Sequence, residues 1–129
     1  MKYPSFDKIV ELNVLALNLI KVKNKDAAKV LSSSKILAVI NECKNFEGAV
    51  YDKAVILLKG LVVAHAFASG NRRTAFLSMK LFLKENNTKL SVTDDPLNAV
   101  VLRGIRENYY SDNEIKEWLK NGKIRQFKR

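Results

Sequence analysis

The stretch that most restricts how this chain can fold runs from Tyr51 to Phe67, where apolar residues lie almost all the way round a helix. A helix that is apolar on every side must be covered on every side, so it belongs in the middle of a protein. Lys59 interrupts the run, and the run is too short to span a bilayer. We therefore interpret it as a buried core helix and expect no membrane association.

The sequence before this run also has helical apolar spacing, with almost no period-two alternation. Ser5 can cap a helix that reaches about Lys21, and Ser34 can open a second one. The residues expected to face inward from these two helices are Ile9, Leu12, Leu15, Ala16, Leu19, Ile36, Leu37, Val39 and Ile40. A polar connection joins the two helices.

The sequence after the central helix predicts three more helices. One starts at Asn71 or Arg72 and reaches about Asn86, and another is entered through Asp94 or Asp95 with Pro96 in its first turn. Ser111 and Glu114 have capping-box spacing for a last short helix. The inward residues of the helix after Asn71 are Phe76, Met79, Phe82 and Leu83. We predict an all-α bundle forming one domain over residues 1–129, with a basic, frayed tail over about 121–129.

Charge and cysteine content narrow the partners and the compartment. The formal net charge is +10, which attracts anions of any kind: nucleotides, acidic proteins, nucleic acid or anionic lipid. Cys43 is the single cysteine and cannot form an internal disulfide, and the N-terminus lacks a secretory pattern. We expect a cytoplasmic protein. One histidine and one cysteine give no zinc-type cluster.

The residues from His65 to Ala75, HAFASGNRRTA, carry the strongest chemical signal. A helix that starts just after Gly70 presents backbone N–H groups that bind phosphate. Arg72 and Arg73 add guanidinium groups that suit phosphate oxygens. Histidine exchanges a proton readily near neutral pH, so His65 is a natural general base. A base beside an anion cradle is what phosphoryl or nucleotidyl transfer to a hydroxyl requires.

This stretch resembles the signature of the Fic/Doc superfamily, His-x-Phe-x-acidic-Gly/Ala-Asn-Lys/Gly-Arg. The matching positions are His65, Phe67, Gly70, Asn71 and Arg73. The preceding AVILLKGLVVA and the following TAFLSMKLFLKENNTKL are similar to the helices that flank the motif in that family. The resemblance implies a compact helical bundle, with a short β-hairpin flap left possible. It also implies a transferase whose substrate is ATP.

Two positions make the chain similar to the Doc (death-on-curing) branch rather than to the adenylylating Fic branch. Fic members usually have Gly before the motif arginine and a second arginine three residues after it, where this chain has Arg72 and Phe76. The Doc resemblance implies phosphorylation of a target hydroxyl, with elongation factor Tu as the target class. Transfer of AMP remains the alternative.

The resemblance also implies the role of each motif residue. His65 is the general base, Phe67 anchors the loop, and Gly70 and Asn71 form the anion hole. Asn71 can also bind phosphate through its side chain, and Arg72 and Arg73 hold the nucleotide phosphates. Arg73 therefore belongs to the catalytic group as well as to the phosphate-binding group.

Ser69 departs from the family pattern, which has an acidic residue there that helps to hold Mg²⁺. A serine hydroxyl can contact Mg²⁺ but brings no negative charge, so we expect weak or water-mediated metal binding. Three readings stay open. The enzyme works with weaker metal affinity, it has lost catalysis and only binds nucleotide or a partner, or the serine was introduced to disable it.

Two further expectations concern partners. The segment from Phe46 through Glu47, Gly48 and Ala49 to Val50 lies where the family has its target-docking flap. Many Fic enzymes inhibit themselves through a Ser/Thr-x-x-x-Glu-Gly/Asn helix, and no Glu of this chain fits that pattern. The resemblance therefore implies inhibition in trans by an antitoxin.

A third function class rests on charge alone. A nucleic-acid binder would use the basic tail, namely Lys120, Lys123, Arg125, Lys128 and Arg129. Base-reading motifs are absent, and the helix after Asn71 is too apolar to lie in a groove. We therefore regard nucleic acid as an unlikely partner.

Overall fold

The computed structural model describes residues 1–19, 29–93 and 96–128, and these ranges contain six helices and no strand. An all-helical fold was predicted, and it is confirmed. The helices are α1 (Phe6–Leu19), α2 (Ser33–Asn45), α3 (Val50–Ala64), α4 (Asn71–Glu85), α5 (Pro96–Arg106) and α6 (Asp112–Asn121). A single antiparallel bridge between Val30 and Phe67 lies outside them.

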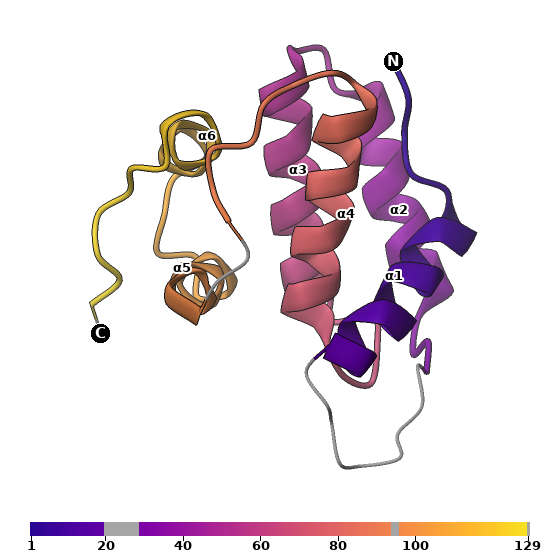
Figure 1. The fold of residues 1–129 in the computed structure, drawn as a ribbon. Coiled ribbons are helices and arrows are strands. Elements are labelled where there is room, and N and C mark those ends of the chain that lie inside the picture. Colours follow the sequence, from indigo (N-terminus) through magenta and orange to yellow (C-terminus); the bar gives the residue numbers. More distant parts are fainter. Residues whose placement is uncertain (20–28, 94–95, 129) are drawn as a thin grey trace.

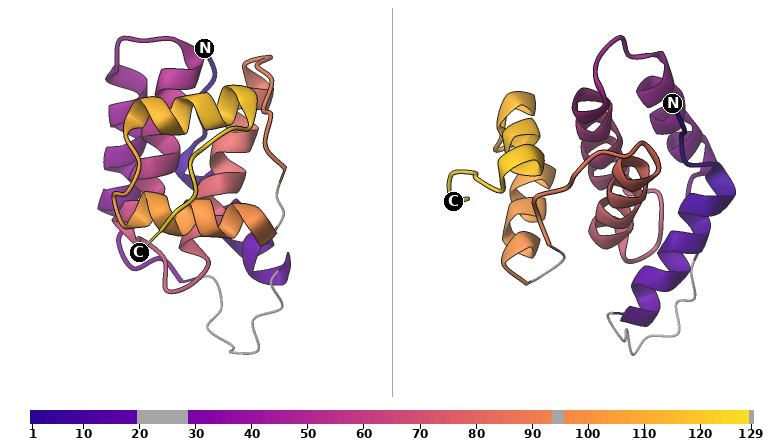
Figure 2. Two further views of the ribbon diagram at one scale, coloured as in Figure 1. Left: turned by 90° about the vertical axis from the view of Figure 1, so that its left-hand side faces the viewer. Right: turned by 45° about the horizontal axis from the view of Figure 1, so that its top comes forward.

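The helices form three layers (Figures 1 and 2). The central layer is α3 and α4, which pack against each other; α1 and α2 lie on one side of it, and α5 and α6 on the other. The central position of α3 was expected from its apolar surface. Its buried residues include Leu57, Leu58, Leu61 and Val62. Helix α4 buries the four residues expected to face inward, Phe76, Met79, Phe82 and Leu83.

Helices α1 and α2 are rotated slightly from the expected faces. Ile9 and Ala16 are buried as predicted, but Leu15 is 46% exposed and Leu37 is 47% exposed. The fully buried residue between Ile9 and Ala16 is Asn13. Positions 9, 13 and 16 follow the spacing of one helical face, so the polar side chain of Asn13 points into the protein. Hydrophobicity alone could not have selected it.

The α5–α6 pair is joined to α3 by side chains as well as by apolar packing. Lys116 Nζ lies 2.9 Å from Asp52 Oδ1, and Lys59 Nζ lies 3.0 Å from Asp112 Oδ1. The predicted capping box of α6 is present, with Ser111 and Glu114 bonding each other's backbone N–H groups. Trp118 of α6 is buried, and its ring lies 6.5 Å from that of Phe76.

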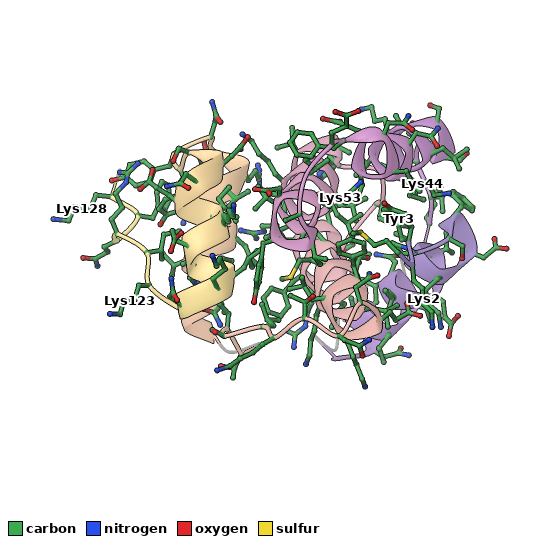
Figure 3. The ribbon with its side chains drawn as sticks, turned by 90° about the horizontal axis from the view of Figure 1, so that it is seen from above. Lys2, Tyr3, Lys44, Lys53, Lys123 and Lys128 are labelled. Atoms are coloured by element: carbon green, nitrogen blue, oxygen red, sulfur yellow. The ribbon has the colours of Figure 1, made fainter. Side chains whose placement is uncertain are left out.

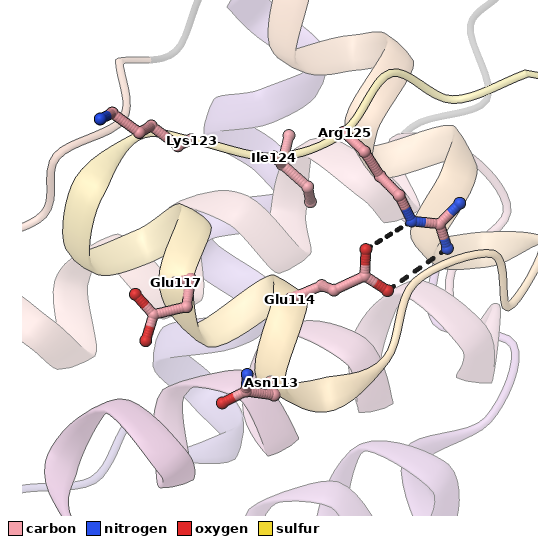
Figure 4. Close-up of a pocket in the computed structure, with 6 residues that line it drawn as sticks. All are labelled: Asn113, Glu114, Glu117, Lys123, Ile124 and Arg125. Carbon is pink, nitrogen blue, oxygen red and sulfur yellow. Dashed lines mark hydrogen bonds and ion pairs between the residues drawn. The ribbon is translucent and has the colours of Figure 1, made fainter.

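The tail after α6 is anchored, whereas the sequence had predicted a frayed one. Arg125 forms an ion pair with Glu114, drawn in Figure 4, and its guanidinium lies 4.0 Å from the centre of the Tyr109 ring. Phe127 also packs on Tyr109, with ring centres 4.9 Å apart. One arginine that stacks on an aromatic ring while paired with a carboxylate holds a segment that lacks regular structure.

A buried lysine lies at the opposite end of the bundle from the α3–α4 connection. Lys53 is 6% exposed, and its Nζ donates to the carbonyl oxygens of Cys43 and Lys44, at 3.0 Å each. Its ammonium also lies 5.2 Å from the centre of the Tyr3 ring, and Figure 3 shows these side chains together. The charge therefore caps the C-terminus of α2, which explains how it can be buried.

Candidate functional site

His65 ends the central helix in an unusual conformation. It is the residue after α3, with φ 48° and ψ 50°, and its side chain is exposed. Left-handed backbone at a helix end is normally taken by glycine, because other residues pay a steric cost there. The conformation turns the chain out of α3 and starts the loop that leads to α4.

The side chain of Asn71 closes this loop. Its Oδ1 accepts a hydrogen bond from the N–H of Phe67 at 2.9 Å, and its Nδ2 donates to the carbonyl of Phe67 at 2.8 Å. Nδ2 also lies 3.4 Å from Nδ1 of His65. The resemblance implied that Asn71 belongs to the anion hole and can also bind phosphate through its side chain. The structure shows this side chain bonded to the loop backbone and in contact with the histidine.

These bonds indicate which tautomer of the imidazole fits the contact with Asn71. Since Phe67 N–H can only donate and its carbonyl can only accept, the orientation of the Asn71 amide is fixed. An N–H donor therefore faces His65 Nδ1, which acts as the acceptor of this contact, so the contact selects the tautomer with its proton on Nε2. The 3.4 Å contact is at the long end for a hydrogen bond, so exchanging the tautomer costs little.

The start of α4 has the geometry of an anion cradle. Gly70 is the N-cap, with φ 75° and ψ 19°, a region that favours glycine. The first helical bond runs from Thr74 N to Gly70 O, so the N–H groups of the first turn have no intrahelical acceptor. Arg72 is exposed and Arg73 is half-buried in this turn. The connection from α3 to α4, which holds His65 and Gly70, and the first turn of α4, which holds Asn71 and both arginines, thus lie at one end of these two helices (Figure 1).

Lys35 adds a positive charge that sequence analysis missed. It lies in the first turn of α2, and its Nζ is 3.4 Å from the carbonyl oxygen of Ala64, the last residue of α3. The ammonium is therefore beside the residue that precedes His65. Because it comes from a different helix, only the folded chain brings it to the site.

The segment before α2 lies against the loop that follows His65. The N–H groups of Leu31 and Ser32 donate to the carbonyl of Ala66, and the N–H of Ala68 donates to the carbonyl of Lys29. This pairing surrounds the Val30–Phe67 bridge. An extended segment thus borders the histidine.

The predicted docking flap is not near His65. Residues 46–49 join α2 to α3 without a strand, and Val50 is the first residue of α3. His65 follows the other end of the same helix, which is about 22 Å long for 15 residues. Figure 1 shows the two connections at opposite ends of α3. Residues 46–50 form no hairpin, because Val50 already begins α3 and only four residues separate it from α2. The segment also lies at the end of α3 away from His65, so it does not border the candidate site (Figure 1).

Ser69 does not provide a charged metal ligand. It is half-buried, and its carbonyl oxygen accepts a hydrogen bond from Asn13 Nδ2 at 2.9 Å. Among residues 1–19, 29–93 and 96–128, no three His, Cys, Asp or Glu side chains are grouped to hold a metal ion. Since Mg²⁺ prefers carboxylates from the protein, the residues present do not fit a protein-held ion.

A separate pocket lies between α6 and the tail (Figure 4). It is lined by Asn113, Glu114, Glu117, Lys123, Ile124 and Arg125. None of the residues predicted for the site contributes to it. The tail lysines Lys123 and Lys128 lie on the other side of the molecule from Lys2, Lys44 and Lys53 (Figure 3).

The fold and site define a class of protein: an α-helical bundle in which a histidine at the end of the central helix contacts the first residue of the next helix. The comparison with protein families matches residues 18–83, just over half of the chain, to the Fic/DOC family. The chain therefore belongs to the Fic/Doc family, whose members are typically transferases of the AMPylation or phosphotransfer type. A comparison with curated proteins finds no match.

Within the part of the chain that the structure describes, no helix is both long enough and apolar enough to cross a bilayer.

Proposed function

We propose that this protein transfers the γ-phosphoryl group of ATP to a hydroxyl of a target protein, with His65 as the general base. The observation that carries the proposal is the contact of Asn71 with His65 at the start of α4. It joins a proton acceptor to a phosphate-binding helix terminus within one loop.

The phosphate-binding part uses the first turn of α4. Its N–H groups and the helix dipole favour negative charge, and Gly70 has no side chain to obstruct a ligand. Arg72 and Arg73 neutralise charge on the phosphates, and Lys35, whose Nζ lies at the carbonyl of Ala64 beside His65, adds a further cation. Positive charge directed at the phosphoryl group is the main requirement of such a transfer.

The proton-transfer part uses the imidazole. The hydroxyl oxygen bonds to the γ-phosphorus, the bond from that phosphorus to the bridging oxygen breaks, and ADP leaves. His65 takes the hydroxyl proton on Nε2. This nitrogen faces away from Asn71, so the single proton of the ring must first move from Nε2 to Nδ1, and the 3.4 Å contact with the Asn71 amide is then given up.

The site favours a reaction in which the protein holds no metal ion through a carboxylate. Ser69 supplies no carboxylate, so any Mg²⁺ would have to be held by the nucleotide, and the arginines supply the fixed positive charge of the protein. This weakened metal site is also the reason to keep a second candidate, a relative that binds nucleotide without turning it over.

We assign phosphoryl rather than AMP transfer from Arg72 and Phe76. Arg72 adds charge beside the motif arginine, and Phe76 is 1% exposed within the core, so no second arginine reaches the phosphates from that position. The target, by the Doc resemblance, is a translation factor such as elongation factor Tu. The segment 29–32, which borders the loop after His65, is where target backbone would approach.

The remaining partners follow from the same resemblance. An antitoxin would inhibit the protein in trans, and the reaction would take place in the cytoplasm. The net charge of +10 suits an acidic antitoxin segment.

The test is label transfer in a cytosolic extract, with ATP labelled on either the α- or the γ-phosphate. The wild type should transfer only the γ-label, and His65→Ala should transfer none. A label from the α-phosphate would replace this proposal with AMP transfer. Bound nucleotide with no transfer of either label would leave the silent relative.

A further inference from the structure

We infer that Asn13 of α1 is a positioning residue for the phosphate-binding loop, because its buried amide turns the N–H of Gly70 toward the ligand. The inference rests on the proposed phosphate site. Helix α1 lies almost wholly outside the span matched to the family, residues 18–83.

Asn13 bonds to both sides of Gly70. Its Nδ2 donates to the carbonyl of Ser69 at 2.9 Å and to Oγ1 of Thr74 at 3.0 Å. Thr74 Oγ1 in turn donates to the carbonyl of Gly70 at 2.7 Å. One amide from α1 therefore holds the residue before Gly70 and the first turn of α4 together.

The surroundings of Asn13 fix the orientation of its side-chain amide. Asn13 is 0% exposed, and the Ser69 carbonyl can only accept, so Nδ2 must point toward it. Its Oδ1 is buried with no hydrogen-bond partner. An unpaired buried oxygen is costly, so hydrophobic packing alone would favour an apolar residue here. The two hydrogen bonds made by Nδ2 are therefore the favourable contribution that asparagine makes to the loop at this position.

The geometry of one peptide group connects Asn13 to the ligand. In a planar trans peptide the C=O and the N–H point in opposite directions. Since the Ser69 carbonyl points to Asn13 in the protein interior, the N–H of Gly70 points outward, away from α1. No hydrogen bond among the described residues uses that N–H. It adds a donor to those of the first turn of α4.

Close packing holds this arrangement. A Cβ on Gly70 would lie 3.2 Å from Leu17 Cδ2 and 3.4 Å from Asn13 Nδ2, so α1 directly backs the loop. The packing keeps α1 against the loop, and the Asn13 bond sets the orientation of the Ser69–Gly70 peptide. Loss of that bond should therefore let the peptide turn without moving the helix.

The experiment measures metal-free binding of inorganic pyrophosphate by calorimetry and by amide NMR. In the wild type, the Gly70 N–H signal should shift as pyrophosphate binds. Asn13→Leu, which keeps the volume and removes both bonds, should weaken binding about tenfold or more, equivalent to about 1.4 kcal/mol. It should also abolish the Gly70 shift.

Two controls separate positioning from stability. Asn18→Leu changes an exposed asparagine of the same helix, and Leu119→Ala destabilises the distant core of α6. Both should bind pyrophosphate within about twofold of the wild type, a difference well below the 1.4 kcal/mol of a tenfold change. Equal binding by a folded Asn13→Leu would overturn the inference.

The wild-type spectrum decides the matter even if Asn13→Leu does not fold. Binding that shifts the Arg72 amide but leaves Gly70 unmoved would overturn the role of Asn13 and keep the proposed phosphate site. Absence of any pyrophosphate binding by the wild type would overturn both.

Discussion

Asn71 Nδ2 lies 3.4 Å from His65 Nδ1, and the same amide bonds both the N–H and the carbonyl of Phe67. One side chain therefore fixes the loop backbone and contacts the proposed base. The side chain of Asn71 therefore links the end of α3, the loop and the start of α4.

Replacing Asn71 tests how much these contacts stabilise the protein. Asn71→Ala removes both bonds to Phe67 and should lower the free energy of unfolding by about 1–3 kcal/mol, because backbone groups of Phe67 lose their partners. Urea denaturation measures the change. Asn41→Ala, at an exposed position of α2, is the control and should be nearly neutral. Equal stability of both variants would contradict the role given to Asn71.

The backbone of His65 makes a prediction that separates stability from activity. With φ at 48°, His65→Gly should relieve the steric cost and raise the free energy of unfolding by about 0.5–1 kcal/mol. The same variant should lose label transfer. His65→Ala should lose it as well, but it should not gain stability, because alanine keeps the steric cost of the left-handed backbone. Thermal unfolding and the transfer assay provide the two readouts. A histidine kept for its structural role would give the reverse result, with a less stable glycine variant.

Ser69 predicts how the site responds to metal. Ser69→Asp introduces a carboxylate beside the proposed phosphate site and should make ATP affinity depend strongly on Mg²⁺. The wild type should show only a small dependence. Ser69→Asn, with similar size and no charge, is the matched control. Calorimetric titration with and without Mg²⁺ makes the comparison, and a wild-type affinity that already requires Mg²⁺ would count against our account.

The tail should respond to acid through Glu114. Hydrogen bonds from Arg125 and from the backbone of Ser111 lower the pKa of Glu114 from 4.5 to about 2. A carboxyl whose folded pKa is depressed adds stability above its unfolded pKa, and this stability is lost as the pH falls from about 4.5 toward 2. The ring signals of Phe127 in NMR should report release of the tail over that range.

Two variants test the origin of the acid response. Glu114→Gln should release the tail even at neutral pH, because the ion pair with Arg125 is gone. Glu47→Gln, at an exposed site elsewhere, should release the tail over the same pH range as the wild type. Acid release that is unchanged in Glu114→Gln would assign the effect to another group.

The helices could be predicted from the sequence because their signals are local. Apolar spacing identified the buried face of α4, and Ser111 with Glu114 marked the start of α6. The motif from His65 to Arg73 also needed only sequence, because its residues share one loop and one helix start.

The rest depended on tertiary contacts. Asn13 and Lys35 reach the site from other helices, and neither has an apolar or motif signal to mark it. The flap was assigned to residues 46–50 because the family resemblance places its target-docking flap in that part of the chain. Only the length of α3 shows that this connection lies at the far end from His65. The anchored tail depends on Arg125 meeting Tyr109 and Glu114, again through packing.

We propose that His65 and the start of α4 share one phosphate site, and the chain's single histidine allows a direct test. Its imidazole C–H signals can be followed by proton NMR during a titration with ATP. We expect these signals to shift and to saturate with the dissociation constant that calorimetry gives, and Arg73→Gln should raise the dissociation constant measured by NMR and by calorimetry to the same extent. Imidazole signals that stay unmoved at saturating ATP would contradict a shared site.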